Sequence, residues 1–323
     1  MEEERTDLLT QVAIWYYEEG LNQADIADRI GKSRSMVSRL LDQAREAGLV
    51  EVRVRYPLRT DNELAQRLCQ AYNLAEAYVL AEPPDDYGLL LRRLGELGAR
   101  RLQEALHPGI TIGLSWGTGV HAVVSAMRFT PVPDATVVQL IGAVGHGDPM
   151  VDGLELARWL AQKLDASFRF LSAPLLVEDE AVAQALRRER INQETLALAA
   201  QAEVAVIGIG TPEAEYSSLL RAGYLHRSDL DELIAAGVAG DIVAHQFDDC
   251  GHLLDISANR RAVNLDAESI RRIPKVIAVS GGVAKARAIA AALRGGYCSC
   301  LVTDAKAAQC VLDRAADCPG SSG

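Results

Sequence analysis

Residues 23–43 read QADIADRIGKSRSMVSRLLDQ, and this stretch decides the architecture of the N-terminal part of the chain. It predicts a short helix over about Asn22–Ile30 and a second helix over Ser33–Ala47, with a serine as N-cap. Ala27, Gly31 and Val37 supply a small residue, a turn glycine and an apolar residue at fixed spacing. This combination is typical of a helix-turn-helix.

The outer face of the second of these helices favours contact with DNA. A pair of helices that served only for packing or dimerisation would carry an acidic or mixed face there. The sequence instead places short hydrogen-bonding residues and arginines, which contact phosphates and base edges at the start of a recognition helix. The predicted DNA-binding residues are Ser33, Arg34, Ser35, Ser38, Arg39 and Gln43.

Charge is distributed unevenly along the chain. From Arg29 to Arg59 there are eight basic and three acidic residues, a local charge of +5 in a chain whose net charge is −11. Such a basic segment is suited to a phosphate backbone, while the rest of the molecule is acidic. Val50–Tyr56 alternates like a strand, and its Arg53 and Arg55 suit either a wing against DNA or a solvated edge strand.

Length and composition indicate two globular domains. The chain has 323 residues, of which 49% are hydrophobic and 24% charged. We expect a helix-turn-helix domain at 1–56, a linker at 57–62, an effector-binding and oligomerisation domain at 63–316 and a tail at 317–323. No apolar run approaches the roughly eighteen residues of a membrane span. The N-terminus, MEEERTDLL, is unlike a signal peptide, so we expect a cytoplasmic protein.

The six cysteines do not suggest a metal site. They form no CxxC pair, and no histidine follows them at zinc-finger spacing. Cys298 and Cys300 alternate along an expected strand, which predicts buried free thiols. We therefore expect neither a metal nor a cofactor.

Beyond the linker, apolar strands alternate with helices. The expected strands are Ala75–Leu80, Ile110–Leu114, Thr136–Ile141, Phe168–Leu171, Val204–Ile207, Asp241–Ala244, Val276–Val279 and Ser299–Thr303. This alternation indicates an α/β domain with a doubly wound, mostly parallel sheet covered on both faces. The whole chain then combines a small all-α, winged helix-turn-helix domain with this larger domain.

Three glycine-bearing loops follow expected strands: GLSWGTG at 113–119, GIGTP at 208–212 and SGGVAK at 280–285. Ligands of parallel sheets bind outside the carboxyl ends of the strands. The first and third loops lead into helices, whose N-termini favour an anion such as phosphate. Any single loop is equally consistent with a tight turn, but their convergence favours a ligand. The candidate effector residues are Ser115, Gly117, Thr118, Gly119, Gly210, Thr211, Gly281, Gly282 and Lys285.

The same loops give no enzymatic signature. GLSWGTG lacks the spacing of a dinucleotide fingerprint, and the chain has neither a GxSxG elbow nor a Walker lysine. Oxidoreductase, hydrolase and nucleotide-hydrolysing functions are therefore disfavoured.

Three stretches closely resemble the SorC family of bacterial sugar-responsive regulators: residues 23–54, GITIGLSWGTGV at 109–120, and IPKVIAVSGGVAKARAIAAALRGGYCSCLVTDAKAA at 273–308. The resemblance implies a domain related in fold to glucosamine-6-phosphate deaminase and ribose-5-phosphate isomerase. It also implies effectors that are usually phosphorylated sugars, and a homotetramer built as a dimer of dimers. It favours Asp248 as a ligand of sugar hydroxyls, whereas the residues alone fit a capped or solvated turn equally well. The chain departs from the family at Thr118–Gly119 and at GAVG, 142–145.

These observations predict a regulator of carbohydrate-metabolism genes that binds double-stranded operator DNA and responds to a sugar or sugar phosphate. The alternatives are a sugar-phosphate isomerase or deaminase, because the related fold hosts such enzymes, and an adaptor that binds proteins through its N-terminal helices. The helix-turn-helix and the lack of an acid/base pair placed by motif argue against an enzyme. An adaptor would show no salt-dependent affinity for DNA.

Overall fold

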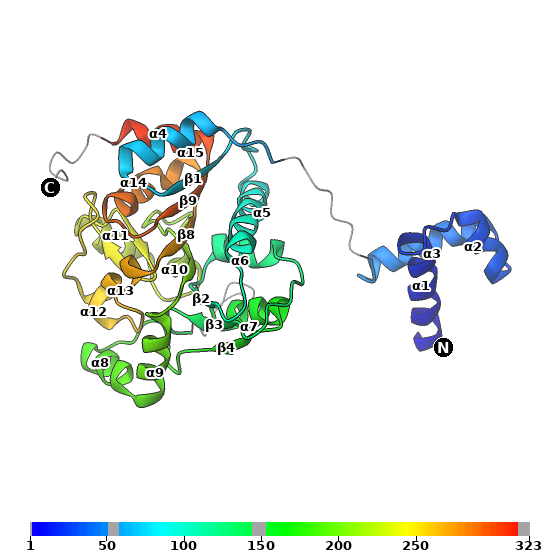
Figure 1. Ribbon diagram of the computed structural model, residues 1–323, viewed down its shortest axis with the longest axis horizontal. Helices are drawn as coiled ribbons and strands as arrows, with labels where there is room; N and C mark the ends of the chain where they lie inside the picture. The colour runs from blue at the N-terminus through cyan, green and yellow to red at the C-terminus, as the bar shows by residue number, and fades with distance from the viewer. Residues whose placement is uncertain (1, 51–57, 144–152, 316–323) are drawn as a thin grey trace. The chain divides into compact units, whose positions relative to one another are not determined.

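The computed structural model describes residues 2–50, 58–143 and 153–315, and the chain divides into two compact units, Met1–Pro57 and Leu58–Gly323 (Figure 1). The predicted wing strand, with Arg53 and Arg55, lies beyond Val50 and so outside the described residues, as does the predicted tail. The wing therefore stays a prediction.

The first unit contains three helices, α1 Glu2–Tyr17, α2 Gln23–Ile30 and α3 Arg34–Glu46. Their apolar faces meet in a small core to which all three contribute, with Val12, Ile26 and Val37 fully buried. Because these residues recur at helical spacing, each helix presents one apolar stripe to the others.

The ends of α2 and α3 confirm the predicted turn chemistry. The Asn22 side chain accepts hydrogen bonds from two backbone N–H groups of α2, and Ser33 accepts one from the Met36 N–H. Gly31 ends α2 with φ +63°, the left-handed conformation that glycine adopts without steric cost. The two helices and their turn thus form as expected for a helix-turn-helix.

The second unit is built on a seven-stranded sheet in the order β1-β9-β8-β5-β2-β3-β4, and every pair in it is parallel. Its strands are β1 Glu76–Leu80, β2 Thr111–Leu114, β3 Thr136–Gln139, β4 Ser167–Arg169, β5 Val204–Gly208, β8 Lys275–Val279 and β9 Cys300–Asp304. Successive side chains alternate between two cores: Val204 and Val206 pack on one face, Ala205 and Ile207 on the other. The predicted α/β class is confirmed.

Helices cover both faces of this sheet (Figure 1). One face carries α5 Tyr87–Ala105, α6 Thr118–Ala126 and α7 Gly153–Leu164; the other carries α4 Asn62–Tyr72, α9 Arg190–Ala199, α14 Ala286–Arg294 and α15 Ala305–Asp313. Helices α5 and α6 approach closely at Gly95, where a Cβ atom would lie 2.4 Å from the Ala122 backbone. A side chain at Gly95 would force the two helices apart.

The prediction that Asp241–Ala244 is a strand of the main sheet is wrong. Asp241 and its neighbours lie in β6 Gly240–Ile242, which pairs antiparallel with β7 His245–Phe247 in a separate two-stranded hairpin. Val243 and Ala244 form the turn between them. Residues 241–244 are mostly apolar, like a strand of the main sheet, because the hairpin is itself buried. Composition alone therefore does not distinguish a buried hairpin from a strand of the main sheet.

Part of the expected linker belongs to the second unit. Leu58 packs against the core of that unit, and Thr60 pairs with Leu80 at the end of β1. The Asp61 side chain caps α4 by accepting a hydrogen bond from the Leu64 N–H. The second unit thus begins several residues before the expected boundary at residue 63.

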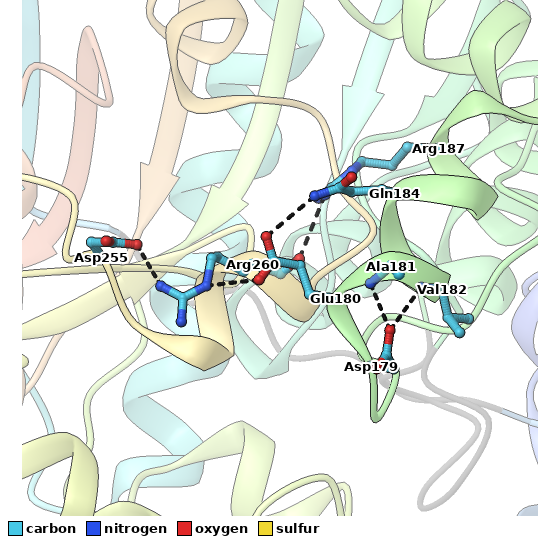
Figure 2. Close-up of polar contacts among 8 residues, drawn as sticks. All are labelled: Asp179, Glu180, Ala181, Val182, Gln184, Arg187, Asp255 and Arg260. Atoms are coloured by element: carbon cyan, nitrogen blue, oxygen red, sulfur yellow. Dashed lines mark hydrogen bonds and ion pairs between the residues drawn. The ribbon is translucent and has the colours of Figure 1, made fainter.

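A polar cluster joins α8 Glu180–Arg188 to α12 Ser257–Arg261 (Figure 2). Arg260 lies between Glu180 and Asp255 and donates to both carboxylates, with 2.9 Å between its Nε and the Glu180 oxygen. Since these side chains are at least 40% exposed, solvent screens both pairs and each contributes little to stability. The cluster orients two surface helices and lies apart from the site below.

The described part of the second unit contains four further helical segments. They are α10 Ser218–Arg221, α11 Arg227–Ala235, α13 Ala267–Arg272 and the 3-10 helix η2 Val283–Lys285. Among the described residues, no helix is long and apolar enough to cross a bilayer. Nor does the described part of the chain contain a group of three or more His, Cys, Asp or Glu residues that could hold a metal. Cys298 and Cys300 are buried free thiols, as predicted.

Candidate functional site

A cavity lies at the carboxyl ends of β2, β5 and β8. All three predicted glycine loops reach this cavity. Parallel sheets bind their ligands at this position, outside the carboxyl ends of the strands. Six of the predicted effector residues line its wall: Ser115, Gly117, Thr118, Gly119, Gly210 and Lys285.

The first loop brings the N-terminus of α6 to the cavity. Gly117, the N-cap of α6, has φ +106° and ψ 171°, a conformation restricted in practice to glycine. Gly119 packs against the end of β8, since a Cβ atom there would lie 2.6 Å from the Val279 carbonyl oxygen. Both glycines are therefore needed to place the first backbone N–H groups of α6 at the cavity.

Lys285 is the cation of the cavity wall. It ends η2, is only 7% exposed, and donates from Nζ to the Ile209 carbonyl oxygen at 2.8 Å. Burial lowers the pKa of Lys285 to about 8, and the neighbouring Asp241 opposes this shift. An anion in the cavity would favour the charged ammonium and raise that pKa again.

Asp241 faces the same cavity and was not predicted as a site residue. Gly210 and Asp241 pair through their backbones, which brings the start of β6 against the loop after β5. Burial raises the pKa of Asp241 to about 6, while Lys285 and a hydrogen bond from the Ala244 backbone N–H oppose the shift. Between about pH 6 and pH 8 the cavity wall therefore holds a buried ammonium and a half-buried carboxylate together.

Helix α10 adds a second cation near the cavity. Ser218 lines the wall, and Arg221 lies three residues later on the same side of this single turn. Its positive charge lowers the pKa of both Lys285 and Tyr87, so the guanidinium lies within electrostatic reach of the wall. Tyr87 itself lines the cavity, packs edge-on against Tyr216, and has its pKa raised to about 12 by burial.

Four predicted effector residues do not line the cavity. The Asp248 carboxylate accepts from the backbone N–H groups of Cys250 and His252, both at 2.9 Å, so it caps its own turn. The Gly282 N–H donates to Asp304, and Thr211 accepts from the Glu213 N–H. These three groups thus make hydrogen bonds within the protein. The residues outside the wall are Thr211, Asp248, Gly281 and Gly282.

The predicted DNA-binding residues lie on α3 and at its N-cap. Ser33, Arg34, Ser35 and Arg39 are exposed, while Ser38 and Gln43 are half-buried. Val37 and Leu41 face the opposite way, into the small core. The helix thus presents one polar, basic face to solvent, as a recognition helix requires.

Comparison with known proteins identifies both units. Residues 56–313 match the Sugar-bind family of sugar-binding domains, and residues 8–47 match region 4 of Sigma-70. The chain is 29% identical to the deoxyribonucleoside regulator of Bacillus subtilis over 97% of this chain and 99% of that protein. It is 30% identical to the transcriptional regulator LsrR of Klebsiella pneumoniae over 95% of this chain and 93% of that protein.

The crystal structure of the full-length sorbitol operon regulator SorC from Klebsiella pneumoniae has the same fold, with a TM-score of 0.72 and 28% sequence identity. The match covers 96% of this chain and 99% of that one. The chain belongs to the SorC family. It is a transcriptional regulator with a DNA-binding helix-turn-helix, as predicted, and its relatives are regulators and not enzymes.

In this SorC-family protein, Gly210 leaves room for the Asp241 carboxylate. A Cβ atom at Gly210 would lie 1.9 Å from the nearer carboxylate oxygen. Gly210→Ala should therefore displace Asp241 and weaken binding of a cavity ligand about tenfold, while lowering the free energy of unfolding by about 1–3 kcal/mol. Calorimetric titration and denaturant unfolding measure the two effects. Gly223→Ala is the control for destabilisation alone: its added Cβ meets no atom within 4 Å, but φ +75° strains an alanine there, so stability should fall while ligand affinity stays unchanged. Unchanged ligand affinity in Gly210→Ala would contradict the prediction.

Proposed function

We propose that the chain binds operator DNA through α3 and that a phosphorylated sugar in the cavity of the second unit controls this binding. The observation that carries the proposal is the presence of a buried cation, Lys285, and a half-buried carboxylate, Asp241, in the wall of one cavity. A buried charge is costly unless a partner or a ligand compensates it, so such groups mark functional sites.

The two charges suit the two ends of a sugar phosphate. Lys285, the α6 N-terminus and Arg221 supply the positive potential and the N–H donors that a phosphate requires. Asp241 is a hydrogen-bond acceptor and suits sugar hydroxyls. The wall also contains Leu91 and Trp116, against which an apolar sugar face can pack.

Regulation then follows from linkage between the two units. A ligand that binds one arrangement of subunits more tightly shifts the equilibrium toward it, and so changes DNA affinity. We expect a cytoplasmic homotetramer, built as a dimer of dimers, whose paired α3 helices read two half-sites of a partly palindromic operator of carbohydrate-metabolism genes. The SorC resemblance supports this assembly.

A thermal-shift panel tests the proposal on the full chain. The probes are glucose 6-phosphate, ribose 5-phosphate and sorbitol 6-phosphate, each beside its unphosphorylated counterpart, and inorganic phosphate. At about 100 times its Kd a ligand stabilises the native state by about 2.7 kcal/mol, a rise of roughly 5 °C or more in Tm. We expect this rise with at least one sugar phosphate and not with its free sugar. Stabilisation by free sugars or polyols alone would contradict the phosphate assignment.

A further inference from the structure

The turn that joins β6 to β7 forms part of the cavity wall. The strands pair at Ile242 and His245, which leaves Val243 and Ala244 as a two-residue loop. Both residues have positive φ, +49° and +59°. This is the pattern of a type I′ hairpin turn, which normally uses Asn-Gly or similar residues.

A valine in this conformation is strained. Its branched Cβ disfavours positive φ, and such residues persist only where the surrounding structure holds them. Val243 also lines the cavity, and the Ala244 N–H donates to the Asp241 carboxylate. The conformation of the turn therefore sets where the carboxylate lies.

One buried side chain holds the strained turn from outside the hairpin. Asn264, which is 4% exposed, donates from Nδ2 to the Val243 carbonyl oxygen at 2.6 Å. Asn264 is itself fixed to the main sheet, since its backbone pairs with Ile141 and the next residue donates from N–H to the Leu140 carbonyl at 2.8 Å. The main sheet, Asn264, the turn and Asp241 are thus connected by contacts in series.

We infer that Asn264 is a positioning residue, which holds the Val243–Ala244 turn in its strained conformation so that Asp241 faces the effector. This inference rests on the proposed function for the identity of the ligand, but the fixed conformation of the turn is a property of the protein alone. Among the hydrogen bonds of the described residues, none joins Asn264 to the wall residues Lys285 and Ser115. Asn264 acts through the turn.

The test is a pair of variants and their combination. Asn264→Ala removes the donor, and Val243→Gly removes the strain, because glycine adopts positive φ freely. Two readouts are used on the full chain: hydrogen exchange of the Ala244 amide, and affinity for whichever of glucose 6-phosphate, ribose 5-phosphate and sorbitol 6-phosphate stabilises the wild type most. We expect Asn264→Ala to speed exchange and weaken the affinity, each about tenfold. Adding Val243→Gly to Asn264→Ala should restore most of the slow exchange. Because Val243 lines the cavity, the affinity of the double variant is compared with that of Val243→Gly alone, and the two should be equal.

A second buried asparagine separates positioning from general destabilisation. Asn192 is fully buried and donates from Nδ2 to the Leu186 carbonyl oxygen at 2.8 Å, but it lies at α9, away from the cavity wall. Asn192→Ala should lower the stability while leaving Ala244 exchange and the affinity unchanged.

Unchanged exchange of the Ala244 amide in Asn264→Ala would overturn the inference, and so would faster exchange that Val243→Gly does not slow again. If no probe binds the wild type, the proposed function fails, and the exchange data alone then decide the role of Asn264.

Discussion

Replacing Lys285 with methionine is expected to weaken binding of the sugar phosphate by about 10- to 150-fold. The buried ammonium is the cation of the cavity wall, and a charge-assisted hydrogen bond to phosphate in a desolvated site is worth about 1.5–3 kcal/mol. Methionine is unbranched and only one heavy atom shorter than lysine, so the shape of the cavity changes little. Calorimetric titration of the full chain measures the loss.

The pH dependence of the measured affinity tests whether the charged ammonium of Lys285 binds the phosphate. Because burial lowers the pKa of Lys285 to about 8, the unliganded protein loses this proton near pH 8, whereas bound phosphate favours its retention. Binding therefore takes up a proton above pH 8, and the wild-type affinity should fall as pH rises from about 8 to 9.5. Lys285→Met should lack this fall.

Lys306→Met serves as the matched control for that variant. Lys306 is an exposed lysine of α15 that pairs with Asp85, so its loss should leave the affinity unchanged. Wild-type affinity in Lys285→Met would show that the phosphate lies elsewhere.

Backbone chemistry made the helix-turn-helix and the first loop predictable from sequence. Asn22, Gly31 and Ser33 act on groups within four residues, so their effect on the chain can be derived locally. Gly117 likewise has a positive φ and lies at the start of a helix. The sequence indicates both features, because it places a glycine between an expected strand and an apolar run. Local constraints of this kind need no knowledge of tertiary structure.

Asp241 was missed because its role depends on a contact across the fold. It reaches the cavity through pairing with Gly210, 31 residues earlier, and through a turn whose residues, Val243 and Ala244, are poor turn formers. The one sign of Asp241 in the sequence was an isolated carboxylate in the apolar run 238–244. The run was interpreted as a strand of the main sheet, so this carboxylate was not considered for the site. Asp248 attracted the prediction instead because it lies in a loop rich in acceptors, where its carboxylate caps the turn.

In the third loop, Lys285 lines the cavity, whereas Gly281 and Gly282 do not. The sequence suggested that SGGVAK leads straight into a helix N-terminus. In the structure a 3-10 turn intervenes before α14, and the Gly282 N–H is used by Asp304 from the end of β9. A carboxylate 22 residues later in the chain thus occupies the group expected to bind an anion, which no local pattern reveals.

The second large effect is expected at α3, where the double variant Arg34→Ala, Arg39→Ala should weaken DNA binding by about 100-fold or more. Both side chains are exposed on the polar face, and their guanidinium groups have no ion-pair partner among the described residues. Each arginine contact to a base or phosphate is worth about 1–3 kcal/mol. The measurement is fluorescence anisotropy with a duplex that the wild type selects from a randomised pool.

The salt dependence of this binding distinguishes the two kinds of contact. If both arginines contact phosphates, the slope of log K against log salt should become shallower by about 1.8; if both read bases, the slope should change less and discrimination among duplexes should fall. Arg45→Ala is the matched control on the same helix, because Arg45 donates from Nε to the Tyr17 hydroxyl at 2.8 Å and is held within the unit. Normal DNA affinity in the double variant, with the Lys285 site intact, would mean that α3 is not the recognition helix.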